Sequence, residues 1–169
     1  MARRHYKLPK ANQARTKGQA LLEFAFILPI LVALTVGVIE LGRYAYLSIL
    51  VGNAARAGAA YGAEHIGYSN DQTGIQLAAG RDYQNNGQNA STLNVTSTVT
   101  CGCDSNGTIS PDTNNACFPS TPPTCPTGAH WVITVHVTAT GQYAALFNYP
   151  GIPNPLNVSK TAFMRAAEN

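Results

Sequence analysis

Glu23 is the residue of this sequence best placed to do chemistry, because its carboxylate stands at the start of a long uncharged segment, residues 24–39. A carboxylate in hydrocarbon is costly unless it has a partner, and ionisable groups in such segments tend to be functional. The nearest cation in the sequence is Lys17, or a new α-amine if the chain is cut after Gly18. We therefore expect Glu23 to act in ion pairing rather than in catalysis.

A second glutamate, Glu40, closes the uncharged segment. Arg43 follows three residues later and lies on the same helical face, so the two side chains can pair. Tyr44 and Tyr46 come next and are typical of the aromatic anchors at a membrane interface. A boundary ion pair and a functional role for Glu40 both remain open.

Four cysteines, Cys101, Cys103, Cys117 and Cys125, lie in a stretch rich in Pro, Asn, Ser and Thr. A bridge between Cys101 and Cys103 would strain the disulfide geometry, which leaves two ways of joining these two residues to the other two. Zinc is the competing interpretation, but the spacing is not that of a typical zinc knuckle. We expect disulfides and no metal, in a compartment outside the cytoplasm.

No motif of a known catalytic class occurs in the sequence, and no nucleophile stands beside a base. His130 and His136 share one face of a predicted strand, but about 20 Å of strand separates them, which is too far for one metal ion. The acidic residues of the C-terminal part are scattered among predicted helix ends and turns. We expect a protein that is not an enzyme and that needs no cofactor.

The charge of the chain is divided unevenly. The formal charge is +3, yet six of the eleven basic residues precede Gly18, and the other five face all eight acidic residues, so residues 19–169 carry about −3. A basic arm can bind nucleic acid, but this arm directly precedes an apolar segment, which favours a cytoplasmic leader under the positive-inside rule. We expect residues 1–18 to form that leader and no nucleic-acid partner.

The elements that position these residues start with one long helix over residues 19–63. Its part at residues 20–42 is long and apolar enough to cross a bilayer, and Pro29 should kink it. The second half must project from the membrane. It contains Gly58 and Gly62, whose four-residue spacing lets helices approach closely; packing against another subunit and packing on its own domain both remain open.

Residues 64–169 are predicted to form an extracytoplasmic α+β domain. Helical spacing predicts a second helix over residues 73–86, and alternation of apolar and polar residues predicts strands at residues 92–100, 130–140 and 156–166. The Cys-rich stretch, residues 101–128, is expected to be a cross-linked loop. The fold class is therefore α+β, with a long N-terminal transmembrane helix, a short second helix and an antiparallel sheet of about three strands.

The stretch KGQALLEFAFILPILVALTVGVIELGRYAYLSILVGNAARAGAAYGA resembles the N-terminal region of TadE-like proteins, minor pseudopilins of the tight-adherence (Tad/Flp) pilus in the type IV pilin superfamily. The likeness consists of a glycine, four residues and Glu-Phe, then an apolar run with an early proline, a Glu-x-Gly-Arg segment and Asn-Ala-Ala-Arg. It covers residues 17–63. The Cys-rich stretch is not part of this signature.

The resemblance implies a pilin-like fold and cleavage by a prepilin peptidase between Gly18 and Gln19, with Glu23 and Phe24 completing the processing site. It implies that Glu23 then pairs with the N-terminal amine of a neighbouring subunit. The residues that it implicates in packing between subunits or helices are Glu23, Pro29, Glu40, Gly42, Arg43, Asn53, Arg56, Gly58 and Gly62. The implied partners are the prepilin peptidase, other pseudopilins with the pilus assembly machinery, and membrane lipid.

Two functions from different classes follow. The first is a processed, membrane-anchored pseudopilin of the inner (cytoplasmic) membrane that takes part, without catalysis, in assembling or initiating an adhesive pilus. The second is a permanently anchored extracytoplasmic binding domain, for example for carbohydrate, that keeps its leader. The mass of the mature N-terminus separates them.

Overall fold

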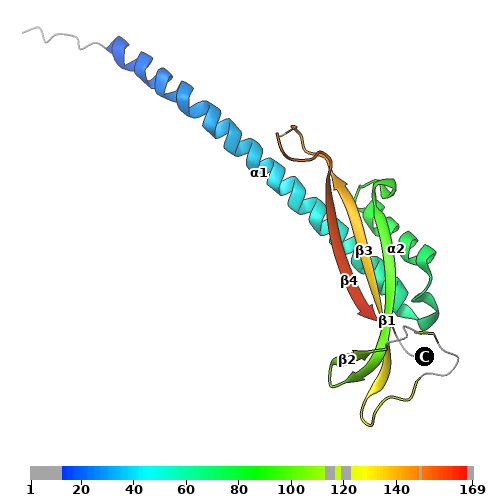
Figure 1. Cartoon of the computed structure of the whole chain (residues 1–169). Helices are drawn as coiled ribbons and strands as arrows, with labels where there is room; N and C mark the ends of the chain where they lie inside the picture. Colours follow the sequence, from blue (N-terminus) through cyan, green and yellow to red (C-terminus); the bar gives the residue numbers. More distant parts are fainter. Residues whose placement is uncertain (1–12, 113–116, 119–122, 149, 167–169) are drawn as a thin grey trace, which may run out of the picture. The chain divides into compact units, whose positions relative to one another are not determined.

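The computed structural model describes residues 13–112, 117–118, 123–148 and 150–166. The chain divides into two compact units, Met1–Leu41 and Gly42–Asn169, and each is described by itself. The elements, labelled in Figure 1, are α1 (Gln13–Glu64), the 3-10 turn η1 (Ile66–Tyr68), α2 (Gln72–Asn85), the 3-10 turn η2 (Ala90–Thr92), β1 (Asn94–Ser105), β2 (Thr108–Pro111), β3 (His130–Tyr143) and β4 (Leu156–Arg165).

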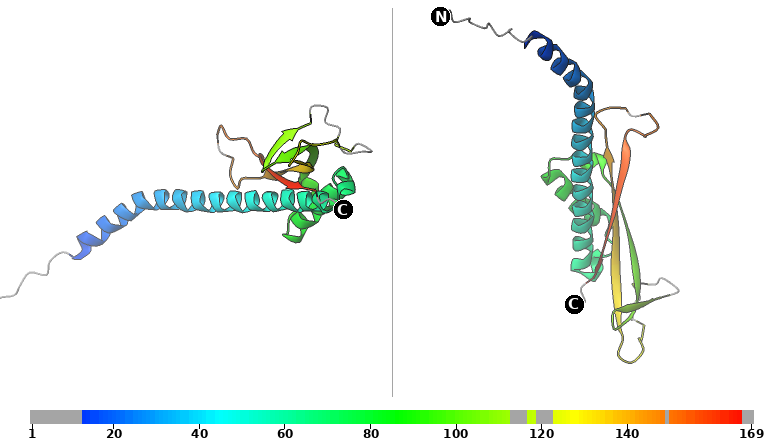
Figure 2. Two further views of the ribbon diagram at one scale, coloured as in Figure 1. Left: turned by 90° about the horizontal axis from the view of Figure 1, so that it is seen from below. Right: turned by 90° about the vertical axis from the view of Figure 1, so that its left-hand side faces the viewer.

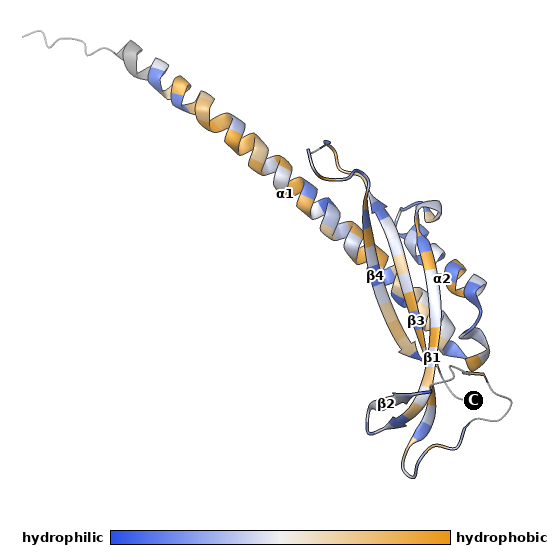
Figure 3. Ribbon diagram, viewed as in Figure 1, coloured by the Kyte–Doolittle hydropathy of each residue, from blue (hydrophilic) through white to orange (hydrophobic). Residues whose placement is uncertain are grey.

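The described residues of the first unit, 13–41, are all helical. Helix α1 begins at Gln13 rather than at residue 19, continues on both sides of Pro29, and bends in its blue N-terminal part (Figure 2). Within the part of the chain that the structure describes, α1 is the one helix long and apolar enough to cross a membrane, and Figure 3 shows its N-terminal half mostly in orange. Residues 1–12, which belong to the predicted leader, lie outside the described residues.

The second unit is built on a four-stranded antiparallel sheet of order β2-β1-β3-β4. The predicted antiparallel sheet is confirmed, with one strand more than the three expected, because β2 forms where a cross-linked loop from residue 101 was predicted. Strand β1 continues to Ser105, and the chain turns back through Asn106 and Gly107, both of which have positive φ. The carboxylate of Asp104 accepts a hydrogen bond from the backbone N–H of Gly107 at 2.8 Å, which fixes this turn. With its long apolar helix, second helix and sheet, the chain has the expected pilin-like α+β fold.

The main core lies between one face of the sheet and two helices, α2 and the C-terminal part of α1 (Figure 2). Helix α1 has its buried positions three or four residues apart, so they form one stripe along the helix. Strand β3 contributes Val135, Val137 and Ala139, which are fully buried, and the predicted alternation of β3 is confirmed at these positions. The members of this core are Leu47, Leu50, Val51, Ala54, Ala55, Ala59, Ile75, Ala79, Tyr83, Val95, Val135, Val137, Ala139 and Val158.

The other face of the sheet is polar and is held by hydrogen bonds between side chains of neighbouring strands. The hydroxyl oxygens of Thr138 and Thr161 lie 2.9 Å apart, and the hydroxyl of Thr140 donates to that of Ser159 at 3.1 Å. This division into a buried apolar face and a solvated polar face is typical of antiparallel sheets.

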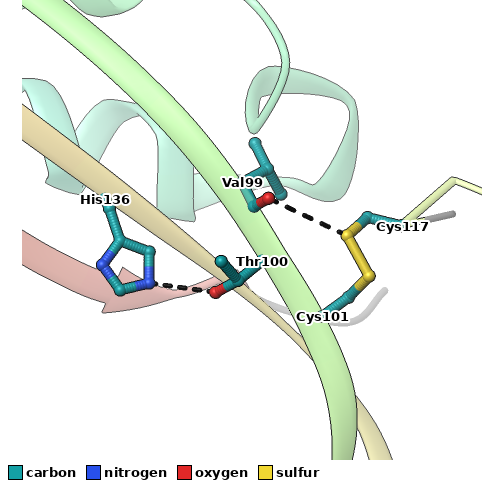
Figure 4. The surroundings of a disulfide bond; sticks show 5 residues. All are labelled: Val99, Thr100, Cys101, Cys117 and His136. Atoms are coloured by element: carbon teal, nitrogen blue, oxygen red, sulfur yellow. Dashed lines mark hydrogen bonds between the residues drawn. A yellow bond between two sulfur atoms is a disulfide. The ribbon is translucent and has the colours of Figure 1, made fainter. Parts of the chain in front are cut away.

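A smaller core surrounds one of two disulfides. Cys101 pairs with Cys117, and Cys103 pairs with Cys125. The predicted disulfides are therefore confirmed, and this pairing is one of the two that the sequence left open. Cys101 and Cys117 are buried with Ile133, and the Cys117 sulfur lies 4.0 Å from the carbonyl oxygen of Val99 (Figure 4). Cys103 and Cys125 are only half-buried.

Helix α2 closes the edge of β1 that β2 does not reach. The side-chain amides of Gln72 and Gln76 both donate to the carbonyl oxygen of Val95, at 3.2 and 3.1 Å. The side-chain oxygen of Gln72 accepts from the backbone N–H of Ser97 at 3.1 Å and from its hydroxyl. Gln72 therefore satisfies the same edge groups as a neighbouring strand would.

Candidate functional site

The candidate site is the helical segment from Gly18 to Phe24. Gly18 is exposed, and a Cβ added there would meet nothing within 4 Å. The side-chain amide of Gln19 donates to the Glu23 carboxylate at 3.3 Å, one helical turn away. The two side chains therefore share one face of α1, and both are exposed. A cation placed at residue 19, or beside it on another chain, can reach the carboxylate from this face.

The segment after Glu23 has apolar side chains exposed all round the helix. Large side chains such as Phe26, Leu34 and Val38 have exposed fractions of 72, 62 and 70%. The one hydroxyl in the middle of the segment, that of Thr35, donates to the carbonyl oxygen of Leu31 at 2.8 Å and so has a partner within the helix. A helix that is apolar on all sides is stable only in lipid or in contact with other apolar surfaces.

The residues just after this segment contact the domain. Arg43 donates to the carbonyl oxygen of Ala144 at 3.4 Å, and its guanidinium lies 5.6 Å from the centre of the Tyr143 ring. Tyr44 meets the same ring edge-on at a centroid distance of 5.6 Å. The pairing of Arg43 with Glu40 stays a prediction.

The residues predicted to pack against other helices fall into a buried group and a more exposed group. Gly58 and Gly62 are buried within their own domain: a Cβ at Gly58 would lie 3.2 Å from a Val137 methyl, and one at Gly62 would lie 3.0 Å from a Val135 methyl. They are therefore not available to another subunit, and the intramolecular alternative is the one observed. The small side chain is needed because the sheet lies so close to α1.

The other members of that set lie nearer the surface. Gly42 is exposed with nothing within 4 Å of an added Cβ. Arg56 is exposed and donates to the side-chain oxygen of Asn53 at 3.5 Å, on the same helix. Their role in contacts with other subunits stays a prediction.

The polar groups of the domain are engaged in structural contacts that sequence reasoning did not find. The nearly buried carboxylate of Asp104 forms an ion pair with Arg165. Asp71 caps α2 by accepting the N–H of Gly74 at 3.0 Å and also accepts the hydroxyl of Tyr61 at 2.8 Å. The hydrogen bond from Gly74, followed by the one from Tyr61, lowers the pKa of Asp71.

The two histidines of β3, His130 and His136, have different surroundings. His130 is exposed, and His136 lies with a ring nitrogen 2.9 Å from the hydroxyl of Thr100 (Figure 4). Among the described residues, no group of three or more His, Cys, Asp or Glu side chains could hold a metal ion. The candidate site stays the N-terminal segment from Gly18 to Phe24.

Comparison with known proteins supports this emphasis. Residues 18–60 match the family model of TadE-like protein, so the resemblance seen in the sequence is confirmed over that stretch. The match begins at Gly18 and includes both the exposed apolar segment and most of the part of α1 that packs on the sheet. No curated protein and no solved structure matches the chain.

Proposed function

We propose that this TadE-like chain is a membrane-anchored pseudopilin, cut between Gly18 and Gln19, that takes part without catalysis in assembling or initiating a Tad/Flp-type pilus. The observation that carries the proposal is the helical segment that starts at Gly18. There a glycine, a carboxylate and an apolar surface exposed on all sides follow one another directly, and the TadE-like match begins at the same glycine.

The exposed apolar surface supports a membrane anchor. About 20 apolar residues span the hydrocarbon core as a helix, and residues 20–42 supply them. The basic residues before Gly18 favour a cytoplasmic leader. The domain then lies outside the cytoplasm, where its two disulfides are stable.

The glycine supports processing at this position. A protease binds a short stretch of its substrate in an opened form, and the bond after Gly18 lies inside α1. Glycine costs a helix about 1 kcal/mol relative to alanine, so local opening is easiest there. Because the position has no side chain and is exposed, no side chain at residue 18 shields the bond to be cut.

Cleavage at this bond would give the Glu23 carboxylate a cationic partner in addition to the Gln19 amide that donates to it. The new α-amine belongs to Gln19, whose side chain already reaches the carboxylate across one helical turn. A neighbouring helix with a small axial shift would bring its own α-amine to the same carboxylate. Such a pair explains why a charge is tolerated at this point, and it would hold the two subunits in register.

The first test is the mass of the mature chain. We expect the purified protein to begin at Gln19. Gly18→Leu should block cleavage, because it adds a side chain and strengthens the helix, whereas Gly37→Leu is the matched control at a second glycine of α1 with open space around it. A chain that keeps Met1 in the presence of the peptidase would instead support the permanently anchored binding domain with its leader.

The second test addresses the carboxylate. Glu23→Gln keeps the shape of the side chain and removes its charge, so we expect a loss of piliation even in the fraction of the chain that is cleaved. Glu64→Gln, at the exposed end of α1, is the control. Normal piliation of the Glu23 variant would show that the charge is not used in assembly.

A further inference from the structure

The described residues of the loop between β3 and β4, 144–148 and 150–155, expose three large apolar side chains. Leu146, Phe147 and Ile152 have exposed fractions of 56, 55 and 56%. The loop has no charged residue. A group of large apolar side chains on one exposed, uncharged segment is more typical of a contact surface than of a surface that faces only solvent.

One side chain holds the two arms of this loop together. The side-chain oxygen of Asn154 accepts from the backbone N–H of Ala145 at 3.1 Å, and its amide donates to the side-chain oxygen of Asn148 at 2.8 Å. The described residues on the two sides of the loop are therefore joined to each other, and the apolar side chains are displayed beside this junction. Figure 1 shows it at the end of the sheet opposite to the β1–β2 hairpin.

This loop is attached to the residues of α1 that directly follow the proposed span. Arg43 donates to the carbonyl oxygen of Ala144, the first residue of the loop, and Tyr44 meets Tyr143 edge-on. Tyr46, two positions after Tyr44, is exposed. Tyrosines and an arginine at the point where a chain leaves a span are typical of the membrane–water interface.

We propose that the β3–β4 loop is a second membrane contact, with Leu146, Phe147 and Ile152 inserted at the boundary between headgroups and acyl chains of the leaflet that α1 leaves. The inference rests on the proposed function, because it needs residues 20–42 to span the bilayer. Lipid is the occupant that the observations favour, since covalent continuity keeps residue 43 at the interface and the loop contacts residue 43.

The chemistry of the loop agrees with this occupant. Interfacial membrane elements combine apolar side chains that enter the acyl boundary with a polar, often basic, surround, and here the contact with Arg43 adds a cation beside the loop. The opposite end of the domain, with the hairpin and the disulfide of Cys103, would then face away from the membrane.

The test uses the full chain in vesicles of neutral phosphatidylcholine. All four native cysteines are engaged in the two disulfides, so one introduced cysteine is the free thiol of each variant. Phe147→Cys reports on the loop, Phe163→Cys on the polar face of the sheet, where it is 71% exposed, and Leu34→Cys on the span. Each variant is labelled with an environment-sensitive fluorophore, and iodide is present both inside and outside the vesicles.

We expect the label at residue 147 to be quenched by lipids with a nitroxide near the headgroup and to lose most iodide quenching. The label at residue 163 should be quenched by iodide, and the label at residue 34 by nitroxides deep in the acyl chains. If residues 147 and 163 are equally open to iodide while residue 34 is protected, the loop proposal is overturned and the span stands.

Two further outcomes separate the remaining possibilities. Iodide quenching at residue 34 would remove the span, and with it both the proposed function and this inference. Protection of residue 147 without lipid quenching, reversed when the protein is diluted with lipid, would mean that a second copy covers the loop, which also overturns the proposal.

Discussion

The two disulfides should contribute unequally to the stability of the domain, although their loops are similar in length. The two cysteines of each bridge lie 16 and 22 positions apart in the sequence. A disulfide that closes a loop of this size restricts the unfolded chain and stabilises a protein by about 3 kcal/mol. Their surroundings differ, because Cys101 and Cys117 are 2 and 5% exposed and Cys103 and Cys125 are half-buried.

The magnitude of the difference follows from this burial. A buried sulfur is similar to a buried methylene in packing, so each adds about 0.8 kcal/mol. Replacing Cys101 and Cys117 by alanine should therefore cost about 5 kcal/mol, against about 3 kcal/mol for Cys103 and Cys125. Substitution in pairs leaves no unpaired thiol.

The assay is urea unfolding of the full chain in detergent, followed by the fluorescence of Trp131. This is the one tryptophan of the sequence, and it packs against the cluster of Cys101, Cys117 and Ile133. Equal losses for the two double variants, or a larger loss for Cys103 and Cys125, would refute the burial argument. The loops share residues 103–117, so removing both disulfides should cost less than the sum of the two.

Three other predictions concern the packing and charges of the domain. Gly62→Val should destabilise it by about 1–3 kcal/mol because the new side chain meets β3, whereas Gly42→Val should change the urea midpoint little; equal effects would contradict the packing. Arg165→Met should cost about 1.5–3 kcal/mol by leaving the Asp104 carboxylate buried without its cation, and adding Asp104→Asn should restore part of the loss. Since the pKa of Asp71 is lowered on folding, its contribution to stability is present above the ordinary aspartate pKa of 3.8 and is lost as pH falls through the folded pKa; Asp71→Asn should flatten the acid limb of a stability-against-pH curve.

Apolar patterning was enough to predict most of the fold. The uncharged run from residue 24 predicts a helix that is apolar on all sides, and residues 130–140 predict a strand with one buried face; both are observed. The spacing of apolar residues predicts these two elements correctly because each face of the element has one uniform environment along its length. The second helix is also observed within one residue of its predicted bounds.

The hairpin was missed although its signal is in the sequence. Asn106-Gly107 is the dipeptide that favours a tight turn with positive φ at both positions, and both residues adopt it. The four cysteines suggested an irregular cross-linked loop in its place. Turn chemistry was the better guide, because a disulfide restrains a chain without deciding whether it pairs as a sheet.

Other features could not be derived from sequence for a physical reason. The spacing of Gly58 and Gly62 is the same whether the surface opposite is a neighbouring subunit or the protein's own sheet. The contact of Gln72 with Val95 and Ser97 joins residues more than twenty positions apart, and a glutamine at a helix start has many possible partners. At the candidate site, the residue types indicated the chemistry, and the structure added the shared face of Gln19 and Glu23.

The capping of β1 by Gln72 also limits how sheets of this protein can join. A sheet that is open along both edges can add copies without end, whereas one with a single long open edge can at most pair with one other. Here the β1 side is closed by the glutamine and by a short strand that ends in Pro111, which leaves β4 as the long outer strand among the described residues. If the chain is anchored in a membrane as proposed, copies can pair through β4 but cannot extend into a continuous sheet, and longer assemblies would need contacts between helices.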